Sequence, residues 1–326
     1  MFRQAALVCQ VLLLLAGYVA RAGDSLPRVH DPVMIKEGAY FYVFSTGMGI
    51  SVMRSADLHQ WENLPPVFSE APKWALEAVA GFKGHIWAPD IAFVRGRYYL
   101  YYSVSAFGKN TSCIGVASNR TLDPSSPDYR WQDHGKVMES VPGRDQWNAI
   151  DPNFIIDENG RPWLSFGSFW NGIQLVALDS SLTKPAHTAA WYTLATRPRD
   201  PSLPDTLAGD GAIEAPFIVR RNGFYYLFVS FDYCCRAEKS TYKIMVGRSR
   251  QVSGPYVDKT GRLMTRGGGS LVKQGDNRWA GTGHNAVCTI GGEDYLIYHA
   301  YDLQDRGRPK LQIKKITWKN DWPELP

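Results

Sequence analysis

The chain has 326 residues, of which 44% are hydrophobic and 13% aromatic, enough to bury a sizeable core. Its 36 Lys and Arg residues against 31 Asp and Glu residues give a net charge of +5, without any block of basic residues. So mild a charge argues against nucleic acid as a partner.

The first 22 residues have the pattern of a secretory signal peptide. Arg3 precedes an apolar stretch from Ala5 to Leu15, and Ala20-Arg21-Ala22 is a small-x-small cleavage site. A transmembrane anchor is the alternative, but the apolar stretch falls short of the roughly 20 residues that a span needs. No other segment is long enough, so we expect a secreted, extracellular protein with no membrane association. Removal of residues 1–22 takes away Arg3 and Arg21 and leaves a net charge of +3.

The rest of the chain repeats one pattern five times. Each repeat begins with a short opening segment, which is followed by an apolar stretch, a polar turn and a second strand-like run, aromatic in four of the five. The opening segments span residues 30–34, 87–91, 150–154, 213–217 and 283–287. If Asp31, Trp87, Asp151, Glu214 and His284 are equivalent, the steps between them are 56, 64, 63 and 70 residues. A period of about sixty is longer than a common WD40 blade and predicts radial repetition around one axis.

Strand signals dominate each repeat. The aromatic residues fall in alternating or continuous runs, and turn dipeptides such as Asn159-Gly160 and Asn222-Gly223 separate paired runs. The length would allow two domains, but no Pro/Ser/Gly linker divides the chain. We therefore expect an all-β fold in which residues 23–326 form a single domain.

Cysteines and glycosylation sequons fit a secreted protein but leave several questions open. Cys9 leaves with the signal peptide, and the remaining four cysteines, which allow three connectivities, are Cys113, Cys234, Cys235 and Cys288. The adjacent Cys234 and Cys235 either form a vicinal bridge or stay as small buried hydrophobes. Sequons begin at Asn110 and Asn119.

Three of the five positions taken as equivalent carry a carboxylate: Asp31, Asp151 and Glu214. At the starts of the innermost strands of a closed ring, these groups would converge on one end of the central channel, as general acid/base chemistry requires. Turn chemistry at a strand entrance explains any one of them alone. Three in register among apolar residues favour a function. Trp87, in an opening segment whose equivalent position lacks a carboxylate, is expected to form a stacking platform at the mouth of the channel.

A family resemblance is carried by six segments, which span residues 30–34, 84–90, 101–110, 147–152, 165–170 and 213–217. Together they resemble the endo-1,5-α-L-arabinanases of glycoside hydrolase family 43. The resemblance implies a five-bladed β-propeller that cleaves internal α-1,5 links of linear arabinan, a polysaccharide of pectin side chains, with inversion. A monomer is the expected state of a small secreted hydrolase.

The resemblance also implies roles for particular residues. Asp31 matches the general base that activates water, Glu214 the general acid that protonates the leaving oxygen, and Asp151 a third carboxylate that tunes and holds the acid. An inverting glycosidase needs one ionised and one protonated carboxyl about 6.5 to 9.5 Å apart. His284 matches a histidine beside a metal ion, usually calcium, that is bound largely through waters in the central channel. The residues expected to contact the sugar chain are Trp87, Phe107, Gly108, Asn148, Ala149, Ile150, Ser168, Phe169 and Trp170.

Two other functions stay open at this point. One is an exo-acting arabinofuranosidase or β-xylosidase of the same family; many such xylosidases carry an extra C-terminal β-sandwich, which we do not expect with eight residues after Trp318. The other is a non-catalytic carbohydrate-binding propeller, which would not need all three carboxylates. Endo or exo action depends on loop shapes that the motifs do not specify.

The chain departs from the family pattern in two places. Its tail, from Trp318 to Pro323, is shorter than usual and lacks a Gly; we expect this tail to help close the ring between the last and first blades. Cys113 and Cys288 stand where small residues such as Ala are usual. A bridge between these two cysteines is therefore a hypothesis specific to this protein.

Overall fold

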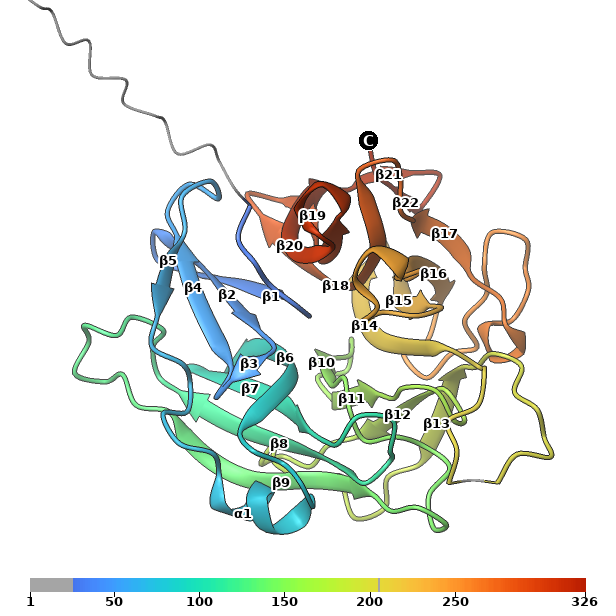
Figure 1. Cartoon of the computed structure of the whole chain (residues 1–326), viewed down its shortest axis with the longest axis horizontal. Coiled ribbons are helices and arrows are strands. Elements are labelled where there is room, and N and C mark those ends of the chain that lie inside the picture. The colour runs from blue at the N-terminus through green and yellow to red at the C-terminus, as the bar shows by residue number, and fades with distance from the viewer. Residues whose placement is uncertain (1–25, 205) are drawn as a thin grey trace, which may run out of the picture.

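Five antiparallel sheets surround one axis and follow one another around it in chain order (Figure 1). The computed structural model describes residues 26–204 and 206–326. These residues form a five-bladed β-propeller, so the predicted all-β class and radial repetition are confirmed. The predicted signal peptide, residues 1–22, lies outside the described residues.

Each blade begins at the axis and runs outward. Blade 1 contains β1 (Val33–Glu37), β2 (Tyr40–Ser45), β4 (Ser51–Ser55) and β5 (Glu62–Leu64). Blade 2 contains β6 (His85–Val94), β7 (Arg97–Val104), β8 (Ser112–Asn119) and β9 (Gln132–Ser140), with β3 (Gly47–Met48) paired to β6. Blade 3 contains β10 (Asn153–Ile156), β11 (Pro162–Phe166), β12 (Ile173–Ala177) and β13 (Trp191–Ala195).

The last two blades contain four and three of the named strands. Blade 4 contains β14 (Ile213–Arg221), β15 (Phe224–Phe231), β16 (Lys243–Ser249) and β17 (Ser270–Lys273). Blade 5 contains β18 (Trp279–Ile290), β19 (Glu293–Asp302) and β20 (Arg308–Lys315). The other elements are α1 (Lys73–Ala78), a hairpin of β21 (Thr317–Lys319) and β22 (Trp322–Glu324), and 3-10 turns at Ala237–Lys239, Met264–Arg266 and Leu303–Asp305.

The aromatic runs lie in strands that are covered on both faces. Seven of the eight residues of β15 are buried, and so are all eight of β8, because each blade packs between two neighbours. Tyr101 of β7 stacks on Phe154 of β10 with ring centroids 5.5 Å apart, so the core lies between blades. Asn222 and Gly223 join β14 to β15 with φ of 50° and 74°, the left-handed pair that a two-residue hairpin turn requires.

Side chains near the axis also tie neighbouring blades together. Asp90 Oδ2 in blade 2 accepts a hydrogen bond from the Phe154 amide (2.7 Å) and one from Asn153 Nδ2 (3.3 Å) in blade 3. Asn153 Oδ1 in turn accepts from the Ile218 amide of blade 4 (2.8 Å). These bonds satisfy inner-strand amides that have no other strand beside them, and they fix the relative height of three blades.

The five opening segments share one backbone feature, which corrects their predicted alignment. Each contains a residue in the left-handed region: Asp31 (φ 53°), Ala88 (45°), Asp151 (58°), Ala215 (56°) and His284 (51°). Trp87 and Glu214 were predicted to be equivalent to Asp31, but the equivalent residues are Ala88 and Ala215, one position later. Glu214 thus occupies the position of His30 and Trp87, so its side chain starts from a different point of the segment.

Each opening segment is held by the blade before it. The Asp151 amide donates to Ser103 Oγ (2.9 Å), and the His284 amide donates to Ser230 Oγ (2.8 Å). The Asp31 amide donates to His299 Nδ1 (3.1 Å). Polar side chains at the ends of the second strands therefore set the strained backbone of these segments, and strain of this kind is typical of functional sites.

Ring closure comes from the start of the described chain. The Val29 amide donates to Pro309 O (3.3 Å), and the Leu311 amide donates to Pro27 O (2.9 Å), so residues 27–29 extend blade 5 beyond β20. The prediction that the tail closes the ring between the last and first blades is wrong. The tail forms its own hairpin, in which the ring of Trp318 packs 4.6 Å from that of Tyr226, a residue of blade 4.

The cysteines separate into a bonded pair and two free thiols. Cys234 and Cys235 form a vicinal disulfide, one of the two predicted states of that pair. Cys113 and Cys288 are free and buried, so the hypothesis of a bridge between them is wrong: they lie on β8 and β18, in different blades, and serve as small apolar side chains.

Both sequon asparagines are buried in the folded chain. Asn110 is 1% exposed and its Nδ2 donates to Asp145 O (3.3 Å), while Asn119 is fully buried and accepts from two backbone amides. A glycan on either amide would displace these contacts.

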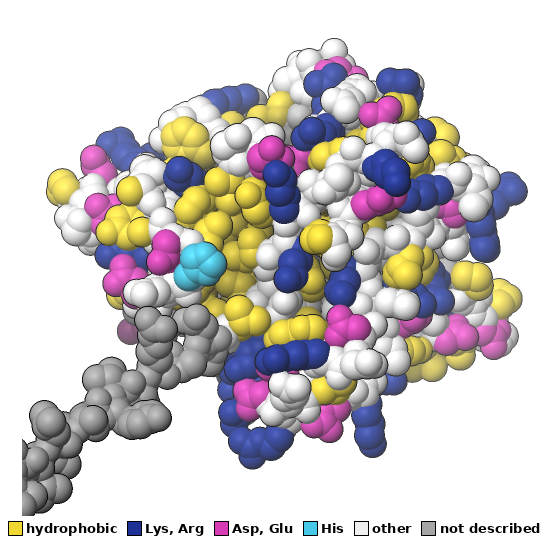
Figure 2. Space-filling model, turned by 90° about the horizontal axis from the view of Figure 1, so that it is seen from above, with side chains coloured by type: hydrophobic (Ala, Val, Ile, Leu, Met, Phe, Trp, Pro, Cys, Tyr) yellow, Lys and Arg dark blue, Asp and Glu magenta, His cyan; other side chains and the backbone are white. Residues whose placement is uncertain are grey.

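The face of the molecule shown in Figure 2 has no single-sign patch of charge. Positive and negative side chains are intermingled over the face seen in Figure 2. Among the helices of residues 26–204 and 206–326, none has the length and apolar character that a bilayer crossing requires.

Candidate active site

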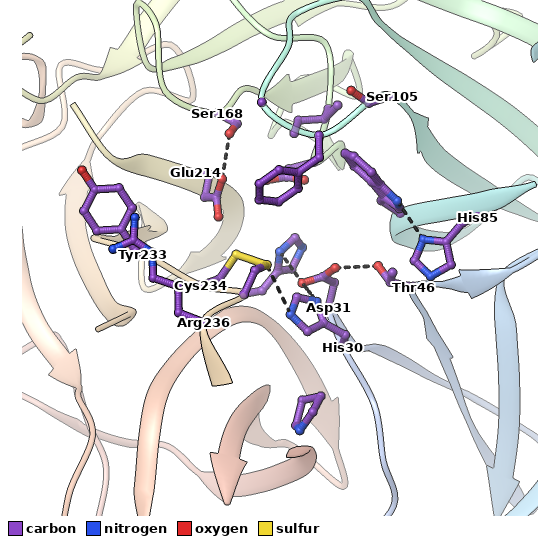
Figure 3. Close-up of a pocket in the computed structure, with 18 of the residues that line it drawn as sticks. His30, Asp31, Thr46, His85, Ser105, Ser168, Glu214, Tyr233, Cys234 and Arg236 are labelled. Carbon is purple, nitrogen blue, oxygen red and sulfur yellow. Dashed lines mark hydrogen bonds and ion pairs between the residues drawn. A yellow bond between two sulfur atoms is a disulfide. The ribbon is translucent and has the colours of Figure 1, made fainter. Parts of the chain in front are cut away.

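A cavity of about 1100 Å³ lies at the end of the channel where the opening segments begin. The carboxylates of Asp31, Asp151 and Glu214 and the ring of His284 all line it, although they come from blades 1, 3, 4 and 5. Figure 3 shows this site, with Asp31 and Glu214 pointing into the same space. The predicted convergence of the three carboxylates on one end of the channel is therefore present.

Asp31 is the most heavily contacted of the three carboxylates. Its Oδ1 lies 2.7 Å from His30 Nδ1 and 3.1 Å from His284 Nδ1, and its Oδ2 accepts from Thr46 Oγ1 (2.5 Å). Burial alone would raise the pKa of Asp31, but His30 and His284 outweigh burial and hold that pKa well below its usual range. Asp31 is therefore ionised at ordinary pH and can accept a proton.

Asp151 has the opposite electrostatic character. Burial raises its pKa to about 8, opposed by His284 and reinforced by the nearby carboxylates of Glu214 and Asp31. Its Oδ2 accepts from the amide of Ala215, the residue that follows Glu214 (3.1 Å). Asp151 is thus a neutral carboxyl near pH 7 that also fixes the backbone next to Glu214.

Glu214 has a hydroxyl at each carboxylate oxygen. Tyr242 Oη donates to Oε1 and Ser168 Oγ donates to Oε2, both at 2.7 Å. Burial raises the pKa of Tyr242 well above its usual value, and the acidic groups of Glu214, Asp151 and Asp31 add to this effect. The Tyr242 hydroxyl therefore keeps its proton. Tyr242 was not singled out from the sequence, because it reaches Glu214 from the far end of the loop that joins β15 to β16.

His284 and its surroundings bear on the predicted calcium site. Burial alone would lower the pKa of His284, but Asp31 above all, with Asp151 and Glu214, raises it to about 9, so a metal ion at this ring would replace a proton. Thr282 Oγ1 and both amide atoms of Asn285 are buried, and within the described ranges none of them has a hydrogen-bond partner. Atoms of this kind usually bind ordered water or an ion. The residues therefore fit a hydrated cation that takes most of its ligands from water.

Eight of the nine residues predicted to contact the sugar chain line the cavity. The exception is Ala149, which is fully buried and whose amide donates to Ser140 Oγ (3.0 Å). Phe107 is 79% exposed and stands at the rim, and Trp87 is held by a bond from its Nε1 to His85 Nδ1 (2.9 Å). Asn148 Oδ1 accepts from Ser112 Oγ (2.6 Å).

Sequence reasoning missed one side of the cavity. This side is formed by His30, by Tyr301 behind it, and by the loop residues Tyr233, Cys234, Cys235 and Arg236. His30 Nε2 lies 2.8 Å from Tyr301 Oη, and the His30 ring stacks on His299 with centroids 4.0 Å apart. A signal was present for His30, which directly precedes Asp31, but the loop lies outside the opening segments and carries no motif of its own.

Comparison with protein families matches residues 27–323 to glycosyl hydrolases family 43. An extracellular exo-α-(1→5)-L-arabinofuranosidase of Cellvibrio japonicus is 52% identical over 96% of this chain and 90% of its own length. An extracellular endo-α-(1→5)-L-arabinanase of Bacillus subtilis is 41% identical over 99% of this chain and 96% of its own length.

Solved structures give the same picture. The α-L-arabinanase of Cellvibrio cellulosa in complex with arabinohexaose superposes with a TM-score of 0.91 at 51% identity, covering 93% of this chain and 96% of that one. An exo-1,5-α-L-arabinanase from a bovine ruminal metagenomic library superposes with a TM-score of 0.88 at 48% identity. The match covers 93% of this chain and 98% of that one.

Proposed function

The chain belongs to glycosyl hydrolases family 43, and from this premise we propose that it hydrolyses α-1,5 links of linear L-arabinan with inversion. The observation that carries the proposal is the meeting of Asp31, Asp151 and Glu214, from three blades, at one cavity. Similarity to relatives named for arabinan over more than nine tenths of this chain supports the substrate.

In the proposed reaction Asp31 is the general base. Water that lies against its carboxylate gives up a proton as its oxygen attacks the anomeric carbon. His30, His284 and Thr46 hold the carboxylate in one orientation from three sides. A pKa held well below the usual range keeps Asp31 ready to accept that proton over a wide pH range.

Glu214 is the proposed general acid, which gives a proton to the glycosidic oxygen as the bond to the anomeric carbon breaks. The hydroxyls of Ser168 and Tyr242 limit the rotation of its carboxyl group. Asp151 binds the Ala215 amide and so positions the acid through the backbone, in keeping with the role expected from the resemblance. The apolar rim residues, Phe107 and Trp87 among them, are proposed to pack against sugar rings.

The enzyme could cleave arabinan by either of two modes of action, endo or exo. Endo-action is what the family resemblance implies, and it has support from the Bacillus subtilis endo-arabinanase at 41% identity. Exo-action is a second candidate, because the relatives named as exo-acting are more similar, at 52% and 48% identity. Both modes use the same carboxylates and differ only in how far the sugar chain extends beyond the cavity.

We also propose a hydrated calcium ion beside His284, on the strand that also carries Thr282 and Asn285. When bound, the ion supplies positive charge close to the carboxylates. Secretion is proposed from the pattern of residues 1–22 and from the extracellular relatives, and the vicinal disulfide suits an oxidising compartment. A monomer is proposed and is checked by light scattering on the purified protein.

The test is a product profile by anion-exchange chromatography. Purified protein is incubated with linear arabinan, branched arabinan, xylan and an aryl arabinofuranoside. Mixed arabino-oligosaccharides early in the reaction support endo-action, whereas a single short product from the first minutes onward supports exo-action. Failure to cleave linear arabinan would contradict the proposed function, and release from xylan or aryl glycoside alone would point to another activity of the family.

A further inference from the structure

The vicinal disulfide forms part of the cavity wall at a place where no sugar contact was expected. Cys234 and Cys235 belong to the loop between β15 and β16, and both line the cavity. Cys235 is exposed, with its Sγ 3.8 Å from His30 Nε2. Figure 3 shows the disulfide on the side of the site where His30 lies, and His30 in turn contacts the Asp31 carboxylate.

A disulfide differs chemically from the two thiols that would replace it. It has no hydrogen to donate, its sulfur atoms are polarisable, and between adjacent residues it closes a small ring that prevents the side chains from turning away. Such a surface suits the C–H face of a sugar ring rather than its hydroxyl groups. In this respect it resembles an aromatic platform, the role proposed for Phe107 and Trp87 in the same cavity.

Two neighbours extend the disulfide into a longer surface. The Arg236 guanidinium lies over the Tyr233 ring, 4.0 Å from its centroid, and the Tyr233 ring lies 6.0 Å from that of Phe169. All of these residues line the cavity. The surface therefore extends from Phe169 to Cys235. Its Phe169 end adjoins Ser168, which contacts Glu214. Its Cys235 end adjoins His30, which contacts Asp31.

The loop that carries this surface is held in place. The Cys235 amide donates to Tyr301 Oη (2.8 Å), and the Arg236 amide donates to Ser240 Oγ (3.0 Å). Gly307 packs so closely that a Cβ there would lie 2.5 Å from the Glu238 nitrogen. A surface fixed before the substrate arrives loses little entropy on binding, which favours affinity.

We propose that the Cys234–Cys235 disulfide, with Tyr233 and Arg236 beside it, is a sugar-binding subsite that packs against the C–H face of an arabinofuranosyl ring next to the cleaved bond. The proposal rests on the proposed function, since it assigns a substrate contact to that same cavity. It adds that the oxidised state of the pair is needed for full affinity.

The test compares oxidised and reduced protein. Dithiothreitol reduces the bond: each sulfur takes up one hydrogen, and the reagent closes to its own cyclic disulfide. We expect KM for arabinohexaose to rise about five-fold on reduction or in the Cys234→Ser/Cys235→Ser variant, with kcat changed less than two-fold. In a Glu214→Gln background, the Kd for arabinohexaose, measured by calorimetry, should rise by the same factor.

Controls separate this contact from general damage. The reductant should have no effect on the double Ser variant, and reoxidation of wild-type protein with oxidised glutathione should restore KM. Lys239→Ala, an exposed change on the same loop but outside the cavity lining, should leave KM unchanged. KM and Kd unaffected by reduction would overturn the subsite, as would a loss of kcat alone. Wild-type protein that does not cleave arabinan would overturn the proposed function instead.

Discussion

Replacement of Asp90 by Asn should make the stability of the protein less sensitive to pH. Asp90 lies on β6 beside the axis, is 5% exposed, and accepts bonds from the Phe154 amide and from Asn153 Nδ2. Burial raises its pKa to about 7, although the bonds from Phe154 and Asn153 act in the other direction. At pH 5 the folded protein therefore holds a neutral carboxyl at a place where the unfolded chain has an ionised one.

The size of the effect follows from linkage. Because the folded-state pKa is raised, the unfolded chain loses its proton first, and stability falls as pH rises from about 4 to about 7, by roughly 1.4 kcal/mol per pH unit. Between pH 5 and pH 8 the wild-type protein should thus lose roughly 3 kcal/mol through this one group. Asn cannot ionise, and its Oδ1 can still accept from the Phe154 amide, so Asp90→Asn should not show this loss.

The assay is urea unfolding followed by tryptophan fluorescence, for both proteins at pH 5 and pH 8. The quantity to compare is the free energy of unfolding of the variant minus that of the wild type. In this difference the titration of His284 and of the other carboxyls largely cancels. That difference should favour Asn by roughly 3 kcal/mol more at pH 8 than at pH 5. Asp90→Ala, which leaves the Phe154 amide unpaired, should be less stable at both pH values by about 1 to 3 kcal/mol. A difference that does not change with pH would refute the reasoning.

Four further predictions concern the cavity. Glu214→Gln should lower kcat on linear arabinan about a thousand-fold while arabinohexaose still binds in calorimetry; loss of binding would argue against its role as acid. Asp31→Asn should lower kcat by a similar factor, and near-normal turnover would remove Asp31 as base. Phe107→Ala should raise KM a few-fold and leave the melting temperature unchanged, because the ring is 79% exposed; a lowered melting temperature would instead indicate packing. Chelation should lower the melting temperature and added calcium should restore it, if His284 marks a metal site; no change would contradict one.

Much of the fold could be predicted because the repeat consists of local signals. Opening segment, turn and aromatic run recur in the chain order of the blades, and burial on both faces explains the aromatic strands. The one-residue error in the alignment arose because carboxylates were matched rather than backbones. A proline directly follows the left-handed residue in four of the five segments, at Pro32, Pro89, Pro152 and Pro216. Aligning these prolines would have paired Ala215 with Asp31.

The candidate site could be predicted from two sources: the opening segments indicated the carboxylates and His284, and the family resemblance indicated most of the sugar-contact residues. Asp31, Asp151 and His284 are set by the repeat itself, and Glu214 stands one residue before an equivalent position. The connection between β15 and β16 brings the disulfide loop to the cavity and Tyr242 to Glu214. Its path depends on packing against Tyr301 and Gly307 in blade 5. Contacts of this kind join residues far apart in the chain and leave no periodic signal.

Closure of the ring by residues 27–29 places the start of the folded domain close to the predicted signal peptide, residues 1–22. Only four residues, 23–26, separate the expected end of the signal peptide from Pro27, whose carbonyl pairs with β20. Trimming the N-terminus by a few residues more would remove the strand that fastens blade 1 to blade 5, and Asp31 lies directly after that strand. If the chain is processed after residue 22, as the sequence predicts, a cut only a few residues further downstream would therefore remove the closing strand and leave Asp31 near a free chain end in an open ring.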